Sequence, residues 1–504
     1  MKKSSIVLAV TAALALAYPA ASYLSGMRLE TKLTQTSDAA TMFPTFKVVK
    51  QNYQRGLFSS VQESTYEFSL PNSDKIVPMS LAEDEPAENN QEMKQDQGAE
   101  QMPHLASNVI TKPLQFTIIN RIQHGPIPGI FGVGAGKVDT EIVLPEEART
   151  EIKKIFGDKK FLNIRTILNY SGGGTIYADS PAVTSIIGTA QDKLNWKGIK
   201  LEASFDEGYN KFNYVVQTDG AQIEATDAKA NTIIHNVQIG KIKLSGDSQR
   251  VYPKSFMFLG NVTFSIDSVN YSNSAKADSG FSLKNLLVAS DSKIKNDLID
   301  MSVKMGIDQI QANKKDIGAF HYDYSLKRLH APSLHKFSEM LMKANQSPKG
   351  PEQVLALQKS FKELGMEILK HDPILSLDRL SLTGKNGEIK GSADVKIVNF
   401  QPEDLENPMM LIPKLESKGQ INIAEALVQE LIENTQTDPN ARSMAMSMFN
   451  MQLANLETQG YVKRDGKNLQ SQLLWSKGKL SVNGKPYPPT AVAEDSGAPG
   501  TQAK

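Results

Sequence analysis

Alternation of polar and apolar residues constrains the fold of this chain more than any other feature. Successive side chains of a strand point to opposite faces of a sheet, so a period of two indicates strands with one buried and one wet face. The pattern is clearest in Lys211–Gln217, Asn236–Leu244, Asn261–Tyr271 and Gly318–Leu326. Turn-forming residues separate these stretches, which predicts a large antiparallel sheet after residue 156.

Hairpins and helices complete the predicted architecture. The predicted hairpins turn at Arg55-Gly56 and at Asn386-Gly387, where turn residues lie between strand-like runs. The predicted helices show an apolar stripe at helical spacing or helix-terminal residues, and they cover residues 145–156, 333–345, 351–371, 424–433 and 441–456.

These elements predict a mainly β fold with helices, of the α+β class. An N-terminal transmembrane helix precedes a large, curved, mostly antiparallel sheet, and the helices at 333–371 and 424–456 cover part of its apolar face. Only a few helices are available for so many strands. An open sheet of this size either closes or keeps a groove that something apolar fills.

The N-terminal segment predicts a membrane anchor. Lys2 and Lys3 precede an uncharged stretch, and the 19 residues from Ile6 to Leu24 reach roughly 28 Å as a helix, about one hydrocarbon core. Lysines on one side only indicate a cytoplasmic N-terminus. The residues assigned to the anchor are Ile6, Leu8, Val10, Leu14, Leu16, Tyr18, Tyr23 and Leu24.

A cleaved signal peptide is the alternative to a retained anchor. Ala15-Leu16-Ala17 is an acceptable small-x-small cleavage site, and the strongly apolar part is short. We expect residues 1–28 to be the anchor or signal and residues 29–485 to form one β-rich periplasmic body. The acidic segment 82–101 and the tail 486–504 lack core-forming residues, which predicts disorder in both.

Composition excludes several classes of function. The net charge is +1, so no global field attracts nucleic acid. The absence of cysteine excludes disulfides, thiolate nucleophiles and cysteine zinc sites, and it suits an oxidising bacterial periplasm. It also excludes a lipoprotein signal.

No motif points to a particular reaction. Gly129–Lys137 is rich in glycine, but Phe131 and Val138 occupy positions that a phosphate loop reserves for glycine and Ser or Thr. The seven histidines form no HExxH or HxH pattern, although a site assembled in space stays open. We therefore expect no cofactor, no metal and no enzymatic activity.

Several short motifs, taken together, resemble one family. They are Asn52–Ser60 just beyond the anchor, His124–Pro128 after a strand, Tyr170–Gly172, Leu469–Trp475, Gly478 and Val482–Gly484. In this order they resemble the YdgA-like family of bacterial inner-membrane proteins, from which the acidic segment and the tail depart. The resemblance implies an inner-membrane anchor and a periplasmic body, and it carries over no catalytic residue.

The motif loops are the remaining candidate sites, and we interpret them as structural. Their residues are Tyr53, Arg55, Gly56, Phe58, His124, Gly125 and Pro126. The favoured function is binding of a lipid or acyl chain in a sheet groove near the inner membrane. The alternative is a scaffold or chaperone-like protein that binds envelope proteins or a second copy of itself. A helix with Met444, Met446, Met448 and Met451 fits core packing, a dimer contact or an apolar partner.

Overall fold

The computed structural model describes residues 22–23, 25–27, 29–31, 46–68, 114–125, 135–188, 191–227, 232–253, 255, 257–274, 279–346, 351–435 and 438–487. The contacts within the chain divide it into two compact units. Unit 1 comprises Met1–Glu151 and Arg165–Tyr170, and unit 2 comprises Ile152–Ile164 and Ser171–Lys504.

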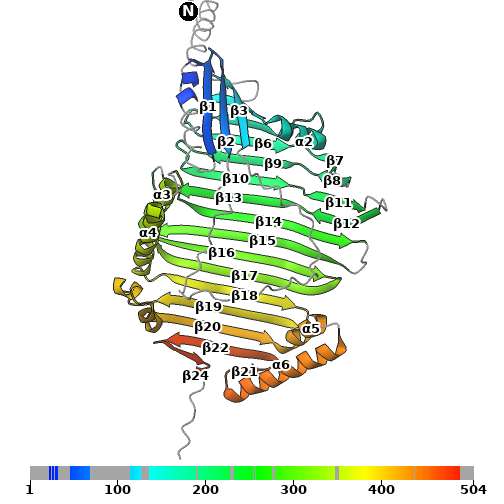
Figure 1. The fold of residues 1–504 in the computed structure, drawn as a ribbon, viewed down its shortest axis with the longest axis vertical. Coiled ribbons are helices and arrows are strands. Elements are labelled where there is room, and N and C mark those ends of the chain that lie inside the picture. The colour runs from blue at the N-terminus through cyan, green and yellow to red at the C-terminus, as the bar shows by residue number, and fades with distance from the viewer. Residues whose placement is uncertain are drawn as a thin grey trace, which may run out of the picture. The chain divides into compact units, whose positions relative to one another are not determined.

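Unit 1 contains an antiparallel meander of strands (Figure 1). In chain order these are β1 (Phe46–Arg55), β2 (Ser59–Phe68), β3 (Leu114–His124) and β4 (Gly136–Val143). The hairpin predicted around Arg55-Gly56 is confirmed, with Arg55 opposite Ser60. The buried positions of β2 include Ser60, Gln62 and Ser64, each at most 3% exposed. A polar side chain is buried at little cost when it is hydrogen-bonded, and Asn120 donates to Gln62 at 3.0 Å.

Unit 2 is built on a long antiparallel sheet (Figure 1). Its main run pairs, in order, β6 (Gly174–Ser180), β9 (Ile199–Phe205), β10 (Lys211–Thr218), β13 (Ile242–Arg250), β14 (Phe258–Asn273), β15 (Gly280–Lys295), β16 (Leu298–Ala312), β17 (Lys315–His330), β18 (Ile374–Gly384), β19 (Gly387–Ile397), β20 (Leu415–Ala424), β22 (Asn468–Ser476), β23 (Lys479–Val482) and β24 (Lys485–Tyr487).

A second ribbon joins this sheet at β14, which is long enough to pair with both β13 and β12. The ribbon consists of β7 (Val183–Ile187), β8 (Asp192–Trp196), β11 (Ala221–Asp227) and β12 (Thr232–Ile239). A short strand, β21 (Lys463–Asp465), pairs with β22. Helix α2 (Glu146–Phe156) and strand β5 (Asn163–Leu168) contribute residues to both units. The antiparallel sheet predicted from the alternation is confirmed.

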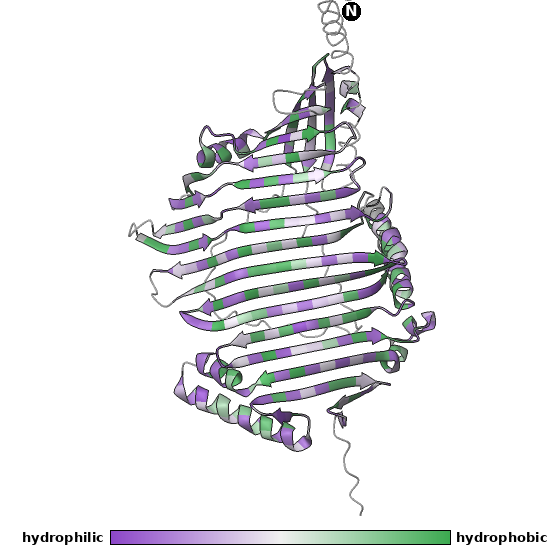
Figure 2. Ribbon diagram, turned by 180° about the vertical axis from the view of Figure 1, so that it is seen from behind, coloured by the Kyte–Doolittle hydropathy of each residue, from purple (hydrophilic) through white to green (hydrophobic). Residues whose placement is uncertain are grey.

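The register of unit 2 gives its sheet one apolar and one polar face. Residues paired across antiparallel strands point to the same side, so the face can be followed from strand to strand. One row contains Leu201, Val216, Leu244, Phe264, Val288, Met305, Tyr322, Leu380, Gly391 and Ile421. The next residue along each strand faces the other side, and Figure 2 shows the resulting alternation of hydrophobic and hydrophilic bands.

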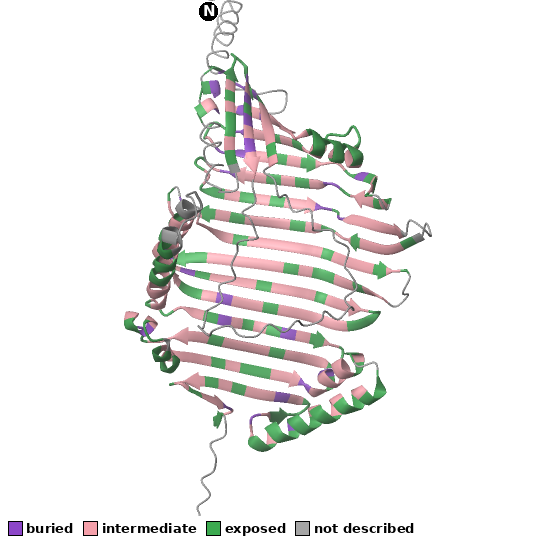
Figure 3. Ribbon diagram, viewed as in Figure 1, coloured by how far each residue is buried: buried purple, intermediate pink, exposed green. Residues whose placement is uncertain are grey.

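None of the side chains in this apolar row is buried. Tyr322 is 37% exposed, Leu380 41% and Ile421 39%, and the others have intermediate exposure. Figure 3 shows the same for most of the sheet, where intermediate positions outnumber buried ones. Side chains that are shielded only by neighbours in the same sheet keep this degree of exposure.

The helices of unit 2 lie at the ends of the strands. The α3 (Ala331–Gln346) and α4 (Pro351–Leu369) helices flank one end, and α5 (Glu425–Thr435) and α6 (Pro439–Gln459) lie at the other (Figures 1 and 2). We predicted that these helices cover part of the apolar face; α5 does so at the end of β18, where Leu427, 1% exposed, packs over Gly384, but the apolar row stays uncovered by them. The α3 helix begins directly after His330 of β17 and α5 directly after Ala424 of β20, so both lie where these strands end, and α4 and α6 follow them in the chain. Two 3-10 turns, η2 (Pro402–Leu405) and η3 (Pro408–Lys414), connect β19 to β20.

One β-bulge interrupts the alternation of β18. Leu377 pairs with Ala393 and Leu380 with Gly391, so three steps along β18 match two along β19. One of Asp378 and Arg379 is therefore an extra residue, and because of it Leu380 lies on the same face as Leu377.

Some sequence predictions fall outside the described residues. They are residues 6–21 and Leu24 of the anchor, the acidic segment 82–101, Pro126, and the tail from residue 488 onward. Among the helical residues that are described, none forms a segment with both the length and the apolarity needed to cross a bilayer.

Candidate functional site

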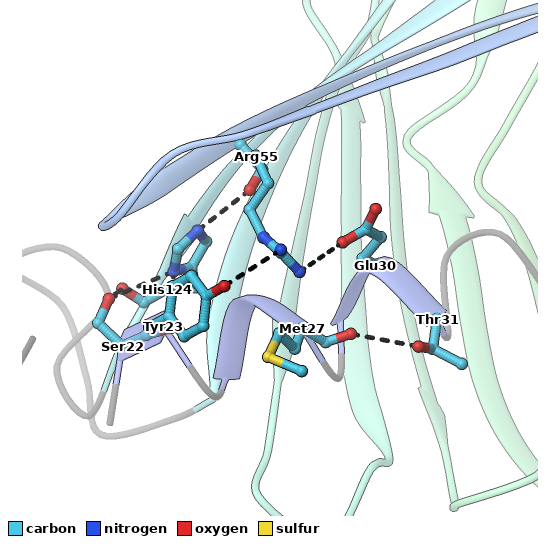
Figure 4. Close-up of polar contacts among 8 residues, drawn as sticks. Ser22, Tyr23, Met27, Glu30, Thr31, Arg55 and His124 are labelled. Atoms are coloured by element: carbon cyan, nitrogen blue, oxygen red, sulfur yellow. Dashed lines mark hydrogen bonds and ion pairs between the residues drawn. The ribbon is translucent and has the colours of Figure 1, made fainter. Parts of the chain in front are cut away.

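His124 is the centre of a buried polar cluster in unit 1 (Figure 4). It is the last residue of β3 and only 2% exposed. Its Nδ1 lies 2.9 Å from the backbone oxygen of Ser22, and its Nε2 lies 3.1 Å from the hydroxyl of Ser60. The Ser22 hydroxyl donates to the backbone oxygen of His124 at 2.7 Å. One imidazole thus links β2, β3 and the segment before β1.

These contacts determine the protonation of the ring. The backbone oxygen of Ser22 can only accept, so Nδ1 carries the proton. In a neutral imidazole Nε2 then accepts from the Ser60 hydroxyl. Burial lowers the pKa of His124, and the nearby Arg55 charge lowers this pKa further, although backbone hydrogen bonds oppose both effects. The cluster therefore contains a neutral histidine.

A short helical segment covers the imidazole. Gly26 belongs to it, and a Cβ at Gly26 would lie 2.8 Å from Cε1 of His124. Leu29 of the same segment is 3% exposed and packs over Gly136, where a Cβ would approach Leu29 Cδ1 to 2.5 Å. Small residues thus let the segment lie flat on β3 and β4. The sequence prediction missed Ser22 and Gly26, because neither belongs to a recognisable motif.

Arg55 holds the same segment from the other side. It donates to the Glu30 carboxylate at 2.8 Å, and its guanidinium carbon lies 5.0 Å from the centre of the Tyr23 ring (Figure 4). We predicted that Tyr23 belongs to the membrane anchor. In the structure the Tyr23 ring lies beside the Arg55 guanidinium of the folded body.

The remaining motif residues shape the turns around this cluster. Gly56 is required by close approach, because a Cβ there would lie 2.8 Å from the backbone oxygen of Ser59. Gly125 has φ +132, a value that favours glycine. Phe58 is 47% exposed, although its backbone oxygen accepts from the His124 amide. Burial raises the pKa of Tyr53.

This geometry supports a structural role for the motif loops. A histidine beside serine hydroxyls is an ingredient of nucleophilic catalysis, which also needs access for a substrate and a group that orients the base. Here the orienting group is a backbone oxygen and the ring is enclosed. The cluster ties three segments together.

The second candidate site is a hollow on the polar face of the unit 2 sheet. It has a volume of about 670 Å³. Its lining side chains on that face are Ser392, Asp394, Lys418, Gln420, Gln472, Leu474 and Ser481. The same face buries Ser325, Ser376 and Ser381 to 2% exposure or less. A groove was predicted to be apolar, but most of the side chains that line this hollow from the polar face are polar, and the apolar row lies on the opposite face.

The fold therefore defines a mainly β protein with a large antiparallel sheet and few helices. Within that class, the chain belongs to a bacterial protein family of unknown function, DUF945, whose model matches residues 1–490. No curated protein and no solved structure matches the chain significantly.

Proposed function

We propose that this protein is a membrane-anchored bacterial envelope protein, without enzymatic activity, that binds lipid or acyl chains on the apolar face of the unit 2 sheet. The observation that supports this most is the apolar row from Leu201 to Ile421. Exposed apolar surface on this scale is rare in a monomer without a binding role. The order of the sequence motifs further supports a place in the YdgA-like family.

The dimensions of the row suit acyl chains. It crosses ten strands, and nine steps of about 4.8 Å give a length of roughly 43 Å. A bilayer core of about 30 Å holds two chains end to end, so one chain needs roughly 15 Å. The row has room for more than one chain, and its side chains offer no fixed pattern of hydrogen-bond donors that would select a polar ligand.

The anchor would place this face close to its ligand. Residues 4–21 are uncharged, and as a helix these 18 residues reach about 27 Å, close to one hydrocarbon core. Ser22 is already hydrogen-bonded to the body. We expect the full chain to stay in the membrane fraction through alkaline carbonate washing. Release of a product that begins near Tyr18 would instead show cleavage.

Two leucines test acyl binding directly, because they match in chemistry and exposure but lie on opposite faces. Leu380 is 41% exposed on the apolar face, and Leu287 is 42% exposed on the polar face, paired with Ser265 and Gly306. The purified chain should bind a fluorescent fatty acid saturably. Leu380→Asn should weaken that binding severalfold, and Leu287→Asn should leave it unchanged. Equal effects of both variants, or no saturable binding, would contradict the proposal.

A scaffold that binds protein partners or itself is the second candidate. The exposed stripe on α6 favours it: Met444 is 67% exposed, Met448 50% and Met451 62%, and this spacing places all three on one helix face. Methionine surfaces adapt to varied apolar partners. If this face mediates self-association, sedimentation will show a dimer that Met448→Glu dissociates. A monomer in both forms would contradict that candidate.

A further inference from the structure

Three potential metal ligands from distant parts of the sequence meet beside the α3–α4 helix pair. His330 ends β17, Glu367 lies in the last turn of α4, and His371 follows that helix. One ligand atom from each lies within 4.8 Å of the others. The Nε2 of His371 is 3.9 Å from Oε1 of Glu367. The sequence alone showed seven scattered histidines and no metal motif.

The groups around these side chains leave suitable atoms free. The Ser333 hydroxyl lies 2.7 Å from Nδ1 of His330, which leaves Nε2 as the nitrogen available to a metal. Lys370 bonds Oε2 of Glu367 at 3.0 Å, so Oε1 is the carboxylate oxygen nearer to His371. Arg328 donates to the backbone oxygen of His371 at 2.8 Å and fixes the segment that carries the ring. Each of the three residues is thus held by a hydrogen bond at an atom that would not coordinate the metal.

We propose that His330, Glu367 and His371 bind a divalent transition-metal ion, of which Zn²⁺ is the best match. Two imidazoles and one carboxylate are borderline ligands that suit Zn²⁺ better than Ca²⁺ or Mg²⁺, which prefer oxygen. A fourth position opens toward a hollow of about 400 Å³ lined by His330, Ser333, Glu367 and Lys370. Water or a polar ligand group can enter there.

Binding requires a small local rearrangement. Ligand atoms on tetrahedral zinc lie about 3.3 Å apart, given metal–ligand bonds of about 2.0–2.2 Å. The ligand atoms now lie within 4.8 Å of one another, and the two imidazole rings stack with centroids 4.3 Å apart and 17° between their planes. Both rings must rotate so that their nitrogens converge. The side chains of Glu367 and His371 are 37% and 35% exposed, so the surroundings leave room for this movement.

The metal would have a structural consequence. It would cross-link the end of β17 to the C-terminal end of α4, a helix that packs on α3 beside the strand ends. Closing the long loop between His330 and His371 would restrict the unfolded chain and stabilise the helix pair. The site is distinct from the apolar row and does not depend on lipid binding.

The test is Zn²⁺ binding to the full chain without an affinity tag, measured by competition with a chromophoric chelator. One equivalent should bind, and His330→Ala, Glu367→Gln and His371→Ala should each weaken binding by about tenfold or more. The matched control is His335→Ala: His335 also faces a glutamate four residues on, Glu339 at 3.8 Å, but belongs to no three-ligand group among the described residues.

Co²⁺ provides a second readout that does not depend on stability. With Co²⁺ bound, the unaltered chain should show the visible absorption of a nitrogen- and oxygen-ligated site, and the His335→Ala variant should show the same spectrum. The His371→Ala variant should lose this absorption, while its circular dichroism still shows a folded protein. Absence of Zn²⁺ binding to the unaltered chain, or binding that all three ligand variants retain, would overturn the proposal.

Discussion

Unit 1 and unit 2 use the same element, the antiparallel strand, in opposite ways. In unit 1 the buried positions of β2 include the polar side chains Ser60, Gln62 and Ser64. In unit 2 the apolar row contains no buried side chain. Unit 1 therefore adds buried polar contacts around His124 to an apolar core that includes Ile122 and Val138, whereas the side chains of the unit 2 row are shielded mainly by neighbours on paired strands. Apolar alternation alone does not reveal which face of a sheet is covered.

The largest expected effect is the loss of the His124 ring. His124→Ala leaves the Ser22 oxygen and the Ser60 hydroxyl without their partner and opens a cavity, at a cost of about 2–3 kcal/mol. Hydrogen exchange of the β2 amides should accelerate by roughly 30- to 150-fold at that cost. The β16 amides should not change. The control is His235→Ala in unit 2, whose Nδ1 bonds the Tyr271 hydroxyl at 3.0 Å. If the β2 amides remain protected in His124→Ala, hydrogen bonding by this ring does not hold unit 1.

The next prediction compares the stability effects of substituting one helical glycine from each unit. Gly26→Ala places a Cβ 2.8 Å from the imidazole of His124, which should destabilise unit 1 by about 1–2 kcal/mol. Gly365 in α4 faces open space, and a Cβ added there would meet no atom within 4 Å. Gly365→Ala should therefore stabilise its helix by about 0.5–1 kcal/mol.

Separate probes distinguish the two units. Both tryptophans, Trp196 and Trp475, belong to unit 2, so tryptophan fluorescence during urea unfolding reports on Gly365→Ala. Exchange of the β2 amides reports on Gly26→Ala. A stabilised unit 1 in Gly26→Ala would show that the imidazole moves aside freely.

A smaller effect is the pH dependence of unit 1. Burial lowers the pKa of His124 in the folded state below its value of about 6.5 in the unfolded chain. Between these two values the unfolded state binds a proton that the folded state does not, so stability rises with pH. Unit 1 should lose at most about 1.4 kcal/mol per pH unit as the pH falls below about 6.5. Exchange of the β2 amides, corrected for its intrinsic pH dependence, measures this loss, and His124→Gln should abolish the His124 contribution.

The smallest effect concerns the ion pair between Arg55 and Glu30. Their side chains are 31% and 37% exposed, so solvent screens the interaction. A double-mutant cycle with Arg55→Gln and Glu30→Gln should give a coupling energy below about 1 kcal/mol that decreases at high salt. A larger, salt-independent coupling would mean that this pair, and not His124, holds the helical segment on the sheet.

Local pattern predicted the elements well, because turns, alternation and helical stripes are encoded over short distances. The turn at Asn386-Gly387 joins β18 to β19, and the predicted helices correspond to α2 through α6. The helices cover less of the apolar face than predicted, because an apolar stripe shows only that a helix packs on something. The stripe does not identify the partner.

The candidate sites were harder to predict. His124 was found through its motif, but Ser22 is separated from it by 102 positions and belongs to a segment interpreted as membrane anchor. His330 and His371 come together only because β17 and α4 end at the same side of the sheet. Neither cluster could be predicted from the spacing of residues within a short stretch of sequence.

The bulge at Asp378–Arg379 has a consequence for how this family can vary in length. Side chains alternate strictly, so one extra residue exchanges the faces of everything beyond it on the same strand. The bulge absorbs that exchange: Leu377 lies on the apolar face before it, and Leu380 and Leu382 lie there after it. Loss of one of these two residues would remove the bulge and place Leu377 and Leu380 two positions apart, so both later leucines would keep the apolar face in a regular strand. Insertions and deletions within these strands are therefore tolerable only in pairs or at a bulge, whereas the loops can change length freely.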